Sequence, residues 1–129
     1  MTVNQARQTL DRQITEKDFQ QSVIDLAQRT GWMVFHPFDM RRSRQGYPDL
    51  TMVNPVRGII VFAELKRENG RLTTDQGDWY QALAVAAGFV NGSDWTVPID
   101  VMESGVYVVV WRPSQWDEIA ELLIGEGAE

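Results

Sequence analysis

The chain has 129 residues, 43% of them hydrophobic, and a net charge of −6 at pH 7. This length suits one compact domain with a hydrophobic core and excludes two domains of ordinary size. The absence of cysteine excludes disulfides and thiolate metal ligands, and no apolar run is long enough for a signal peptide or a membrane span, so we expect a soluble, intracellular protein.

The first predicted element is a helix that begins after Thr15 and ends at Gly31. Thr15 and Asp18 have the spacing of a capping box. The apolar residues at helical intervals behind them are Phe19, Val23, Leu26 and Ala27. Residues 1–14 are predicted to be a polar arm, and the bulky apolar residues 32–38 indicate a strand.

Residues 49–53 and 59–66 predict two further strands joined by a tight turn. Both alternating sets of side chains in the second of these strands are apolar, which is typical of a strand covered on both faces. Because strand side chains alternate with a period of two, Glu64 and Lys66 are expected to project together, on the side of Phe62.

The second half of the chain predicts a helix, a strand and a helix. Residues 73–87 form the first helix, with Thr73 and Gln76 at capping-box spacing. Residues 106–111 follow as a strand and residues 113–123 as the last helix. The order αβββαβα predicts a single α/β domain with a central mixed sheet of about four strands, flanked by helices.

Asp49 and Glu64 are candidate metal ligands because a hairpin brings their ends of the two strands together. Hard oxygen ligands favour magnesium or manganese over softer metals. Lys66 beside them would stay charged and could orient a water or offset the charge of a phosphate. The alternative without a catalytic role is a solvated Glu–Lys ion pair on the surface. The apolar strand that carries the two residues favours the catalytic interpretation.

Basic residues are concentrated around these side chains although the whole chain is acidic. Residues 36–72 hold seven basic and four acidic side chains, whereas every other part of the chain is neutral or acidic. Arginines in such a segment can simply keep a loop soluble, but beside a phosphate-cleaving site we favour contacts with a DNA backbone. The predicted DNA-binding residues are Arg41, Arg42, Arg44, Arg67 and Arg71.

Three short stretches carry a resemblance to a known family. "GYPDL" (46–50), "ELK" (64–66) and "GRLTTDQ" (70–76) together resemble the VRR-NUC family, the virus-type replication-repair nucleases of the PD-(D/E)xK superfamily, over residues 16–119. The resemblance implies a restriction-endonuclease-like core and Mg²⁺- or Mn²⁺-dependent hydrolysis of DNA. It also implies a bacterial or phage-encoded homodimer that acts on branched DNA such as Holliday junctions or flaps.

For the site, the resemblance implies one metal centre with a catalytic lysine. The implied metal ligands are Asp49, Glu64, the main-chain carbonyl of Leu65 and, from the first helix, Glu16. Lys66 corresponds to the catalytic lysine and Gln76 to the glutamine that follows the core motif. Two alternatives stay open: Gln76 may serve only the capping box, and Glu16 may be favoured only by the helix dipole.

The segment between the helix at 73–87 and the strand at 106–111 departs from the family. We therefore predict a nuclease domain at 15–124 with an insertion at 89–105, followed by an acidic tail at 125–129. Trp95 in the insertion suits a hairpin, a dimer contact or a stacked base, and plain packing is favoured. His36 is interpreted as a packed or hydrogen-bonded structural residue rather than a general base.

Two other classes of function remain as alternatives. A non-catalytic module of the same fold would bind DNA junctions without cutting them, and the complete set of acids and lysine argues against it. A protein interaction domain would use the acidic second half of the chain, and the arginine cluster argues mildly against that.

Overall fold

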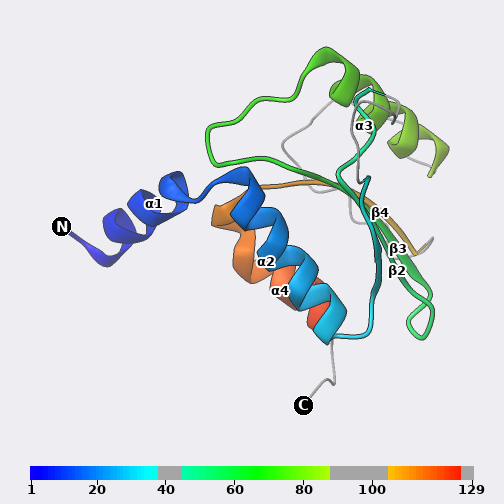
Figure 1. Ribbon diagram of the computed structural model, residues 1–129, viewed down its shortest axis with the longest axis horizontal. Helices are drawn as coiled ribbons and strands as arrows, with labels where there is room; N and C mark the ends of the chain where they lie inside the picture. The colour runs from blue at the N-terminus through cyan, green and yellow to red at the C-terminus, as the bar shows by residue number, and fades with distance from the viewer. Residues whose placement is uncertain (38–44, 88–104, 126–129) are drawn as a thin grey trace.

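The computed structural model describes residues 1–37, 45–87 and 105–125, which form a four-stranded sheet with helices on both faces (Figure 1). The strands are β1 (Met33–Phe35), β2 (Leu50–Asn54), β3 (Ile59–Leu65) and β4 (Val106–Trp111). The helices are α1 (Val3–Gln13), α2 (Glu16–Arg29), α3 (Thr74–Ala86), the 3-10 helix η1 (Pro113–Gln115) and α4 (Trp116–Ile124). The predicted α/β class and the predicted order of elements from α2 onward are confirmed.

The sheet is mixed, with the strand order β1-β2-β3-β4. β2 pairs antiparallel with both β1 and β3, whereas β4 pairs parallel to β3. Parallel neighbours need a crossover connection, and α3 lies in the chain between β3 and β4. As a result, β3 and β4 end at the same edge of the sheet.

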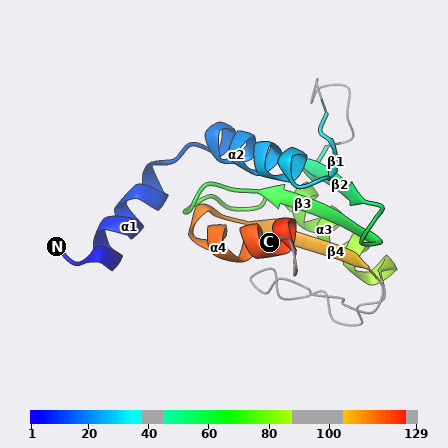
Figure 2. The same cartoon turned by 90° about the horizontal axis from the view of Figure 1, so that it is seen from below.

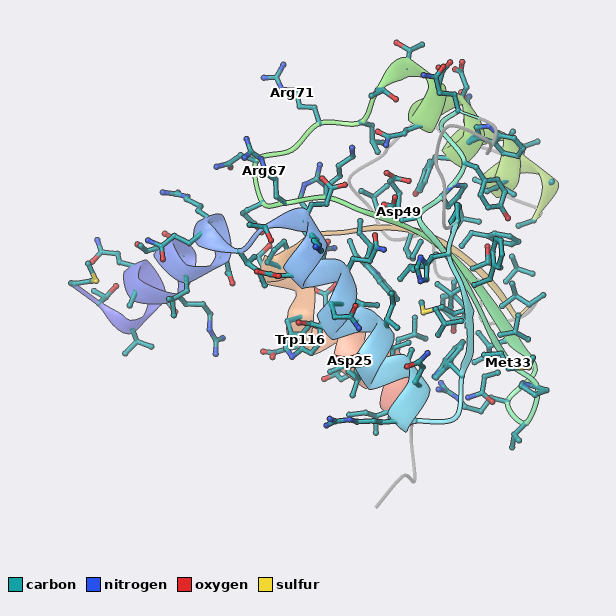
Figure 3. All side chains as sticks on the ribbon, in the orientation of Figure 1. Asp25, Met33, Asp49, Arg67, Arg71 and Trp116 are labelled. Atoms are coloured by element: carbon teal, nitrogen blue, oxygen red, sulfur yellow. The ribbon has the colours of Figure 1, made fainter. Side chains whose placement is uncertain are left out.

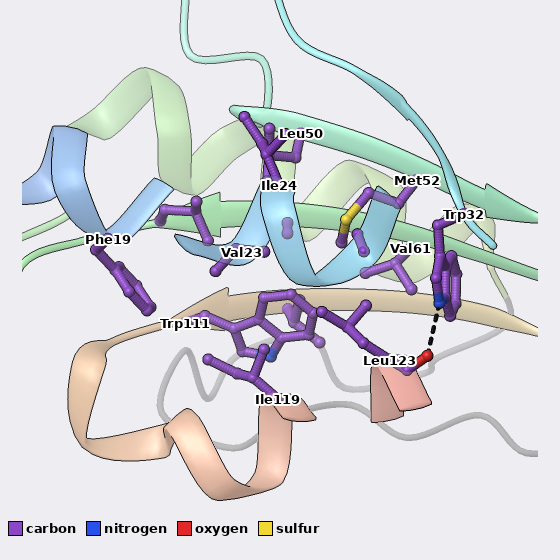
Figure 4. Packing of buried hydrophobic residues seen from close by; sticks show 14 residues of the cluster. Phe19, Val23, Ile24, Trp32, Leu50, Met52, Val61, Trp111, Ile119 and Leu123 are labelled. Atoms are coloured by element: carbon purple, nitrogen blue, oxygen red, sulfur yellow. Dashed lines mark hydrogen bonds between the residues drawn. The ribbon is translucent and has the colours of Figure 1, made fainter. Parts of the chain in front are cut away.

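The larger part of the core lies between the sheet and the pair α2 and α4 (Figure 2). Val61, Ala63 and Leu65, one alternating set of β3, are fully buried there. Trp32 closes the far end of this layer, where its Nε1 donates a hydrogen bond to the carbonyl of Leu123 at 2.8 Å (Figure 4). The helices supply the rest of the apolar surface through Phe19, Val23, Ile24, Ala27, Ile119 and Leu123.

The smaller part of the core lies under α3 on the opposite face. Tyr80 packs there with Val108 and Val110 of β4, and Phe62 of β3 contacts the same cluster. The prediction that β3 is covered on both faces is correct near Phe62 but not at the start of the strand, because Ile60 is 36% exposed. Among the described elements, α3 thus covers only the part of this face that leads to Glu64.

The segment that leads into β2 is packed tightly against the first turn of α3. Gly46 has a φ of +87°, and a Cβ there would collide with the main chain of Asp75. Tyr47 packs edge-on against Trp79 with ring centroids 5.1 Å apart. These contacts hold α3 at a fixed position relative to the entrance of β2.

The structure differs from the sequence prediction near the N-terminus and at β1. The expected polar arm contains a helix, α1, which starts with a capping box between Thr2 and Gln5, has no buried residue and extends away from the body of the domain (Figure 2). β1 is shorter than predicted and ends before Pro37, which has no N–H to donate to a neighbouring strand. His36 is exposed, so the packed alternative for this residue is wrong, and a hydrogen-bonded structural role stays a prediction.

None of the helices in the described part of the chain is both long enough and apolar enough to cross a membrane.

Candidate metal and nuclease site

The hairpin register brings Asp49 and Glu64 together at one end of the sheet. Leu50 pairs with Ala63, so Asp49 precedes the first paired residue of β2 opposite the end of β3. The Oδ2 of Asp49 accepts a hydrogen bond from the main-chain N–H of Leu65 at 2.8 Å. This bond crosses from one strand to the other and fixes the orientation of the Asp49 carboxyl group at the sheet end, where the loop enters β2 (Figure 3).

Glu64 and Lys66 project from β3 on the same side, as the period of two predicts. Both are nearly inaccessible: Glu64 is 3% exposed and Lys66 is 7% exposed. The Nζ of Lys66 lies 3.9 Å from the Oε1 of Glu64. This buried arrangement contradicts the alternative of a solvated surface pair, since burying two charges costs free energy that a surface pair avoids.

Gln76 makes both of the contacts that were open alternatives in the sequence. Its Oε1 accepts from the N–H of Thr73 at 2.9 Å, and its own N–H donates to the Thr73 hydroxyl at 3.2 Å, which completes the capping box of α3. Its Nε2 donates to the Oε1 of Glu64 at 2.7 Å. The side-chain amide of Gln76 therefore caps the N-terminus of α3 and also binds the carboxyl group of Glu64.

The carboxyl groups of Asp49 and Glu64 are only partly compensated by Lys66. Burial, and after it the neighbouring carboxyl group of Asp49, raise the pKa of Glu64 from 4.5 to about 9, although Lys66 acts to lower it. Burial also raises the pKa of Asp49, against the lowering effects of the Leu65 N–H, Glu64 and Lys66. One oxygen, the Oε2 of Glu64, is buried without a hydrogen-bond partner.

These features fit a hard divalent cation. Two carboxylates in a buried site repel each other, and a cation between them would relieve that repulsion and satisfy the unpaired oxygen of Glu64. The main-chain carbonyl of Leu65, which the family resemblance implies as a further ligand, stays a prediction. Lys66, whose Nζ lies 3.9 Å from the Oε1 of Glu64, faces two carboxyl groups.

Glu16 lies within electrostatic range of this group. Burial raises its pKa; Lys66 acts to lower it, Asp49 to raise it and Arg67 to lower it. Within residues 1–37, 45–87 and 105–125, however, no three His, Cys, Asp or Glu side chains converge as a metal-binding group. Glu16 therefore adds charge at the margin of the Asp49–Glu64 pair, and its predicted role as a ligand stays a prediction.

The predicted DNA-binding arginines fall into two groups. Arg67 and Arg71 lie on the loop between β3 and α3, exposed and directed away from the sheet (Figure 3). The other three, Arg41, Arg42 and Arg44, lie outside the described residues, as does the insertion from residue 89 to residue 104 with Trp95.

Sequence reasoning missed Arg112. It follows β4 directly, and Trp111 of β4 is paired with Leu65 of β3, so Arg112 leaves the sheet beside Lys66. Its Nη2 donates to the carbonyl of Gly70 at 3.0 Å. The sequence feature that could have indicated Arg112 is its position directly after the strand at residues 106–111. If that strand is parallel to β3, the carboxyl ends of both strands lie at the same edge of the sheet.

The double role of Gln76 gives a stability prediction. Glutamate suits the capping box equally well, so Gln76→Glu keeps the cap but replaces a hydrogen-bond donor to Glu64 with a third acidic group beside the buried pair Asp49 and Glu64. We expect the free energy of unfolding near neutral pH to fall by about 1–3 kcal/mol in urea titrations. Gln5→Glu is the matched control, because Gln5 forms the same capping box in α1 with both groups exposed.

Equal effects of Gln76→Glu and Gln5→Glu would show that the contact with Glu64 contributes nothing beyond the cap.

Comparison with known proteins adds one finding. The family model of the VRR-NUC domain matches residues 2–94, from α1 through α3, and the matched range includes Glu16, Asp49, Glu64, Lys66 and Gln76. It starts earlier and ends earlier than the resemblance read from the motifs. Neither the curated proteins nor the solved structures give a significant match.

Proposed function

The chain belongs to the VRR-NUC domain family, and on that premise we propose that it is a Mg²⁺- or Mn²⁺-dependent DNA endonuclease that prefers branched or flapped DNA. Membership of the family makes the chain a nuclease domain. The observation that supports the metal-dependent mechanism is the buried, unpartnered Oε2 of Glu64 beside Asp49 and Lys66.

In this proposal Asp49, Glu64 and the carbonyl of Leu65 hold the cation. Once bound, a divalent cation supplies a lowered pKa for a water molecule and offsets negative charge on the phosphorus oxygens. The Leu65 N–H holds the Oδ2 of Asp49, and the Gln76 amide holds the Oε1 of Glu64. Both carboxyl groups are therefore oriented before the cation arrives, which reduces the reorganisation needed for catalysis.

Lys66 would act on the phosphate and the attacking water. Its ammonium group is buried beside Glu64, so its charge is poorly screened by solvent. At that position it can hold a water in line with the bond to be broken and offset the charge that develops on the phosphate. Phosphodiester hydrolysis needs no further acid from the chain if a second water protonates the leaving oxygen.

The DNA would approach over the loop between β3 and α3. Arg67 and Arg71 are exposed on that loop and beside the site, where contacts with the phosphate backbone would bind DNA without reading its sequence. The preference for branched DNA and a homodimeric state follow from the resemblance of stand-alone members of the family to Holliday junction resolvases.

The first test is the metal dependence of cleavage on a panel of DNA structures. We expect labelled four-way junctions and flaps to be cut with Mg²⁺ or Mn²⁺, faster than linear duplex or single strands. Chelation should stop cleavage, and added metal should restore it, because the cation supplies the activated water. Product formation is followed on denaturing gels.

A Glu64→Gln preparation made in parallel reports any contaminating nuclease. Cleavage that continues in excess chelator would overturn the metal-dependent mechanism, and equal rates on linear and branched DNA would overturn the structural preference.

A further inference from the structure

A cavity of about 450 Å³ lies next to the candidate site, between the loop that follows β3, the first turn of α3 and the residue that follows β4. Arg71 lines it from the loop and Arg112 from the end of β4; Thr73, Thr74 and Asp78 of the α3 region complete its wall. Two guanidinium groups against one carboxylate give this cavity a positive charge, although the chain as a whole is acidic.

Arg112 is held in place on this cavity. One of the five N–H donors of its guanidinium group binds the carbonyl of Gly70, and the side chain is half-buried. The loop at Gly70 is tight, since a Cβ there would lie 3.2 Å from the carbonyl oxygen of Arg67. A guanidinium group whose position is fixed in advance loses little conformational entropy when its remaining donors bind a phosphate.

Arg71 brings a second guanidinium group to the cavity, and this one is exposed. It is directed away from the sheet on the same loop, so it can close over a group that enters the cavity (Figure 3). Two guanidinium groups can donate hydrogen bonds to different oxygens of the same phosphodiester.

The cavity and the candidate metal ligands both lie against the first turn of α3. Thr73 and Thr74 line the cavity, and Gln76 on the same turn of α3 holds the Oε1 of Glu64. A helical turn advances about 5 Å. A DNA strand carries one phosphate per nucleotide, about 3.4 Å of duplex axis apart, so a strand that runs over this turn of α3 presents neighbouring phosphates to the metal site and to the cavity.

We propose that Arg71 and Arg112 together clamp one backbone phosphate of the cleaved strand, next to the phosphate held by the metal site. This inference rests on the proposed nuclease function and adds to it the path of the DNA strand, over the first turn of α3. It also assigns to Arg112 a positioning role that the sequence did not predict.

The test is the salt dependence of DNA binding, measured by fluorescence anisotropy in a Glu64→Gln background without divalent metal, so that nothing is cut. Each phosphate contact contributes a slope of about 0.9 to the plot of log affinity against log salt. We expect Arg71→Gln and Arg112→Gln each to weaken binding of a four-way junction about tenfold and to lower this slope by about one.

The double variant separates a shared phosphate from two independent contacts. A clamp on one phosphate predicts that Arg71→Gln combined with Arg112→Gln lowers the slope by about one, as each single change does. A loss of about two would overturn the clamp, because it requires two separate phosphates.

Controls keep the test independent of folding and of catalysis. Arg29→Gln, an exposed change at the end of α2 roughly 20 Å along the helix from Glu16, should leave the slope unchanged. Arg112→Lys keeps a charge and a donor for Gly70 and should restore most of the slope. Unchanged slopes in both single variants, with normal metal-dependent cleavage when the same changes are made in the protein that keeps Glu64, would overturn this inference alone. A parent protein that binds no DNA would overturn the proposed function as well.

Discussion

Glu64→Gln is expected to abolish cleavage and, at the same time, to stabilise the metal-free protein. Loss of a charged metal ligand should lower the cleavage rate by on the order of 10³-fold. Glutamine has the same shape, and its carbonyl oxygen can still accept the hydrogen bond from Gln76. The variant therefore loses the negative charge that the buried site tolerates poorly without a cation.

The gain in stability should depend on pH in a defined direction. The pKa of Glu64 is 4.5 in the reference state and about 9 in the folded protein. Between these values the folded state binds a proton that the unfolded state has released, so the free energy of unfolding falls as pH rises through this window. Glutamine does not titrate, and its advantage over the wild type should grow to about 2–3 kcal/mol near neutral pH.

Thermal melts of the metal-free proteins from about pH 5 to about pH 8 measure this effect. Added Mn²⁺ should raise the melting temperature of the wild type far more than that of Glu64→Gln, because the cation binds the folded state through this carboxylate. Glu118→Gln, an exposed change on α4, should alter neither cleavage nor the pH profile. A Glu64→Gln protein that cuts DNA normally, or that is less stable than the wild type at the alkaline end, would contradict the site as described.

The backbone positions of Asp49, Glu64 and Lys66 could be predicted because they depend on local rules. Strand alternation places Glu64 and Lys66 on one side, and a hairpin joined by a short turn leaves few registers that bury one full set of β3 side chains. The prediction of α2, α3 and α4 likewise follows from apolar residues at helical spacing. These patterns depend on residues that are close together in the sequence, so they can be recognised without knowing how the domain packs.

The parts that could not be predicted depend on packing between distant segments. The raised pKa of Glu64 arises from burial, which exists only once α3 covers the end of β3. Arg112 reaches the site because β4 is parallel to β3, and Glu16 comes near because α2 begins at the same edge. The helix α1 was missed for a different reason: its capping box was readable at Thr2 and Gln5, but most of its residues are polar and none is buried.

Lys66→Met should lower cleavage by about 10²–10³-fold while leaving metal binding in place. Methionine fills a similar volume, and the main-chain N–H of Lys66 keeps its hydrogen bond to the carbonyl of Trp111. Asp49 and Glu64 remain to hold the cation, so Mn²⁺ should still raise the melting temperature. The loss in rate then reports the contribution of the ammonium group to the reacting phosphate and water.

The same variant should shift the pH dependence of stability in the direction opposite to Glu64→Gln. Lys66 acts to lower the pKa of both Asp49 and Glu64. Its removal leaves the carboxylates less compensated, so the metal-free variant should lose more stability than the wild type as pH rises. Lys17→Met is the matched control, since Lys17 is the only other lysine and is exposed at the start of α2.

Single-turnover cleavage and melts at several pH values, on the same protein preparations, measure both effects of Lys66→Met. If Lys66 behaved like an exposed lysine, its substitution would change the cleavage rate little and leave the pH dependence of stability unchanged, which is the result expected for Lys17→Met. A loss of metal-induced stabilisation in Lys66→Met would mean that the lysine holds the carboxylates in place rather than acting on the phosphate. The two readouts together therefore distinguish a lysine that takes part in the reaction from one that only stabilises the buried acids.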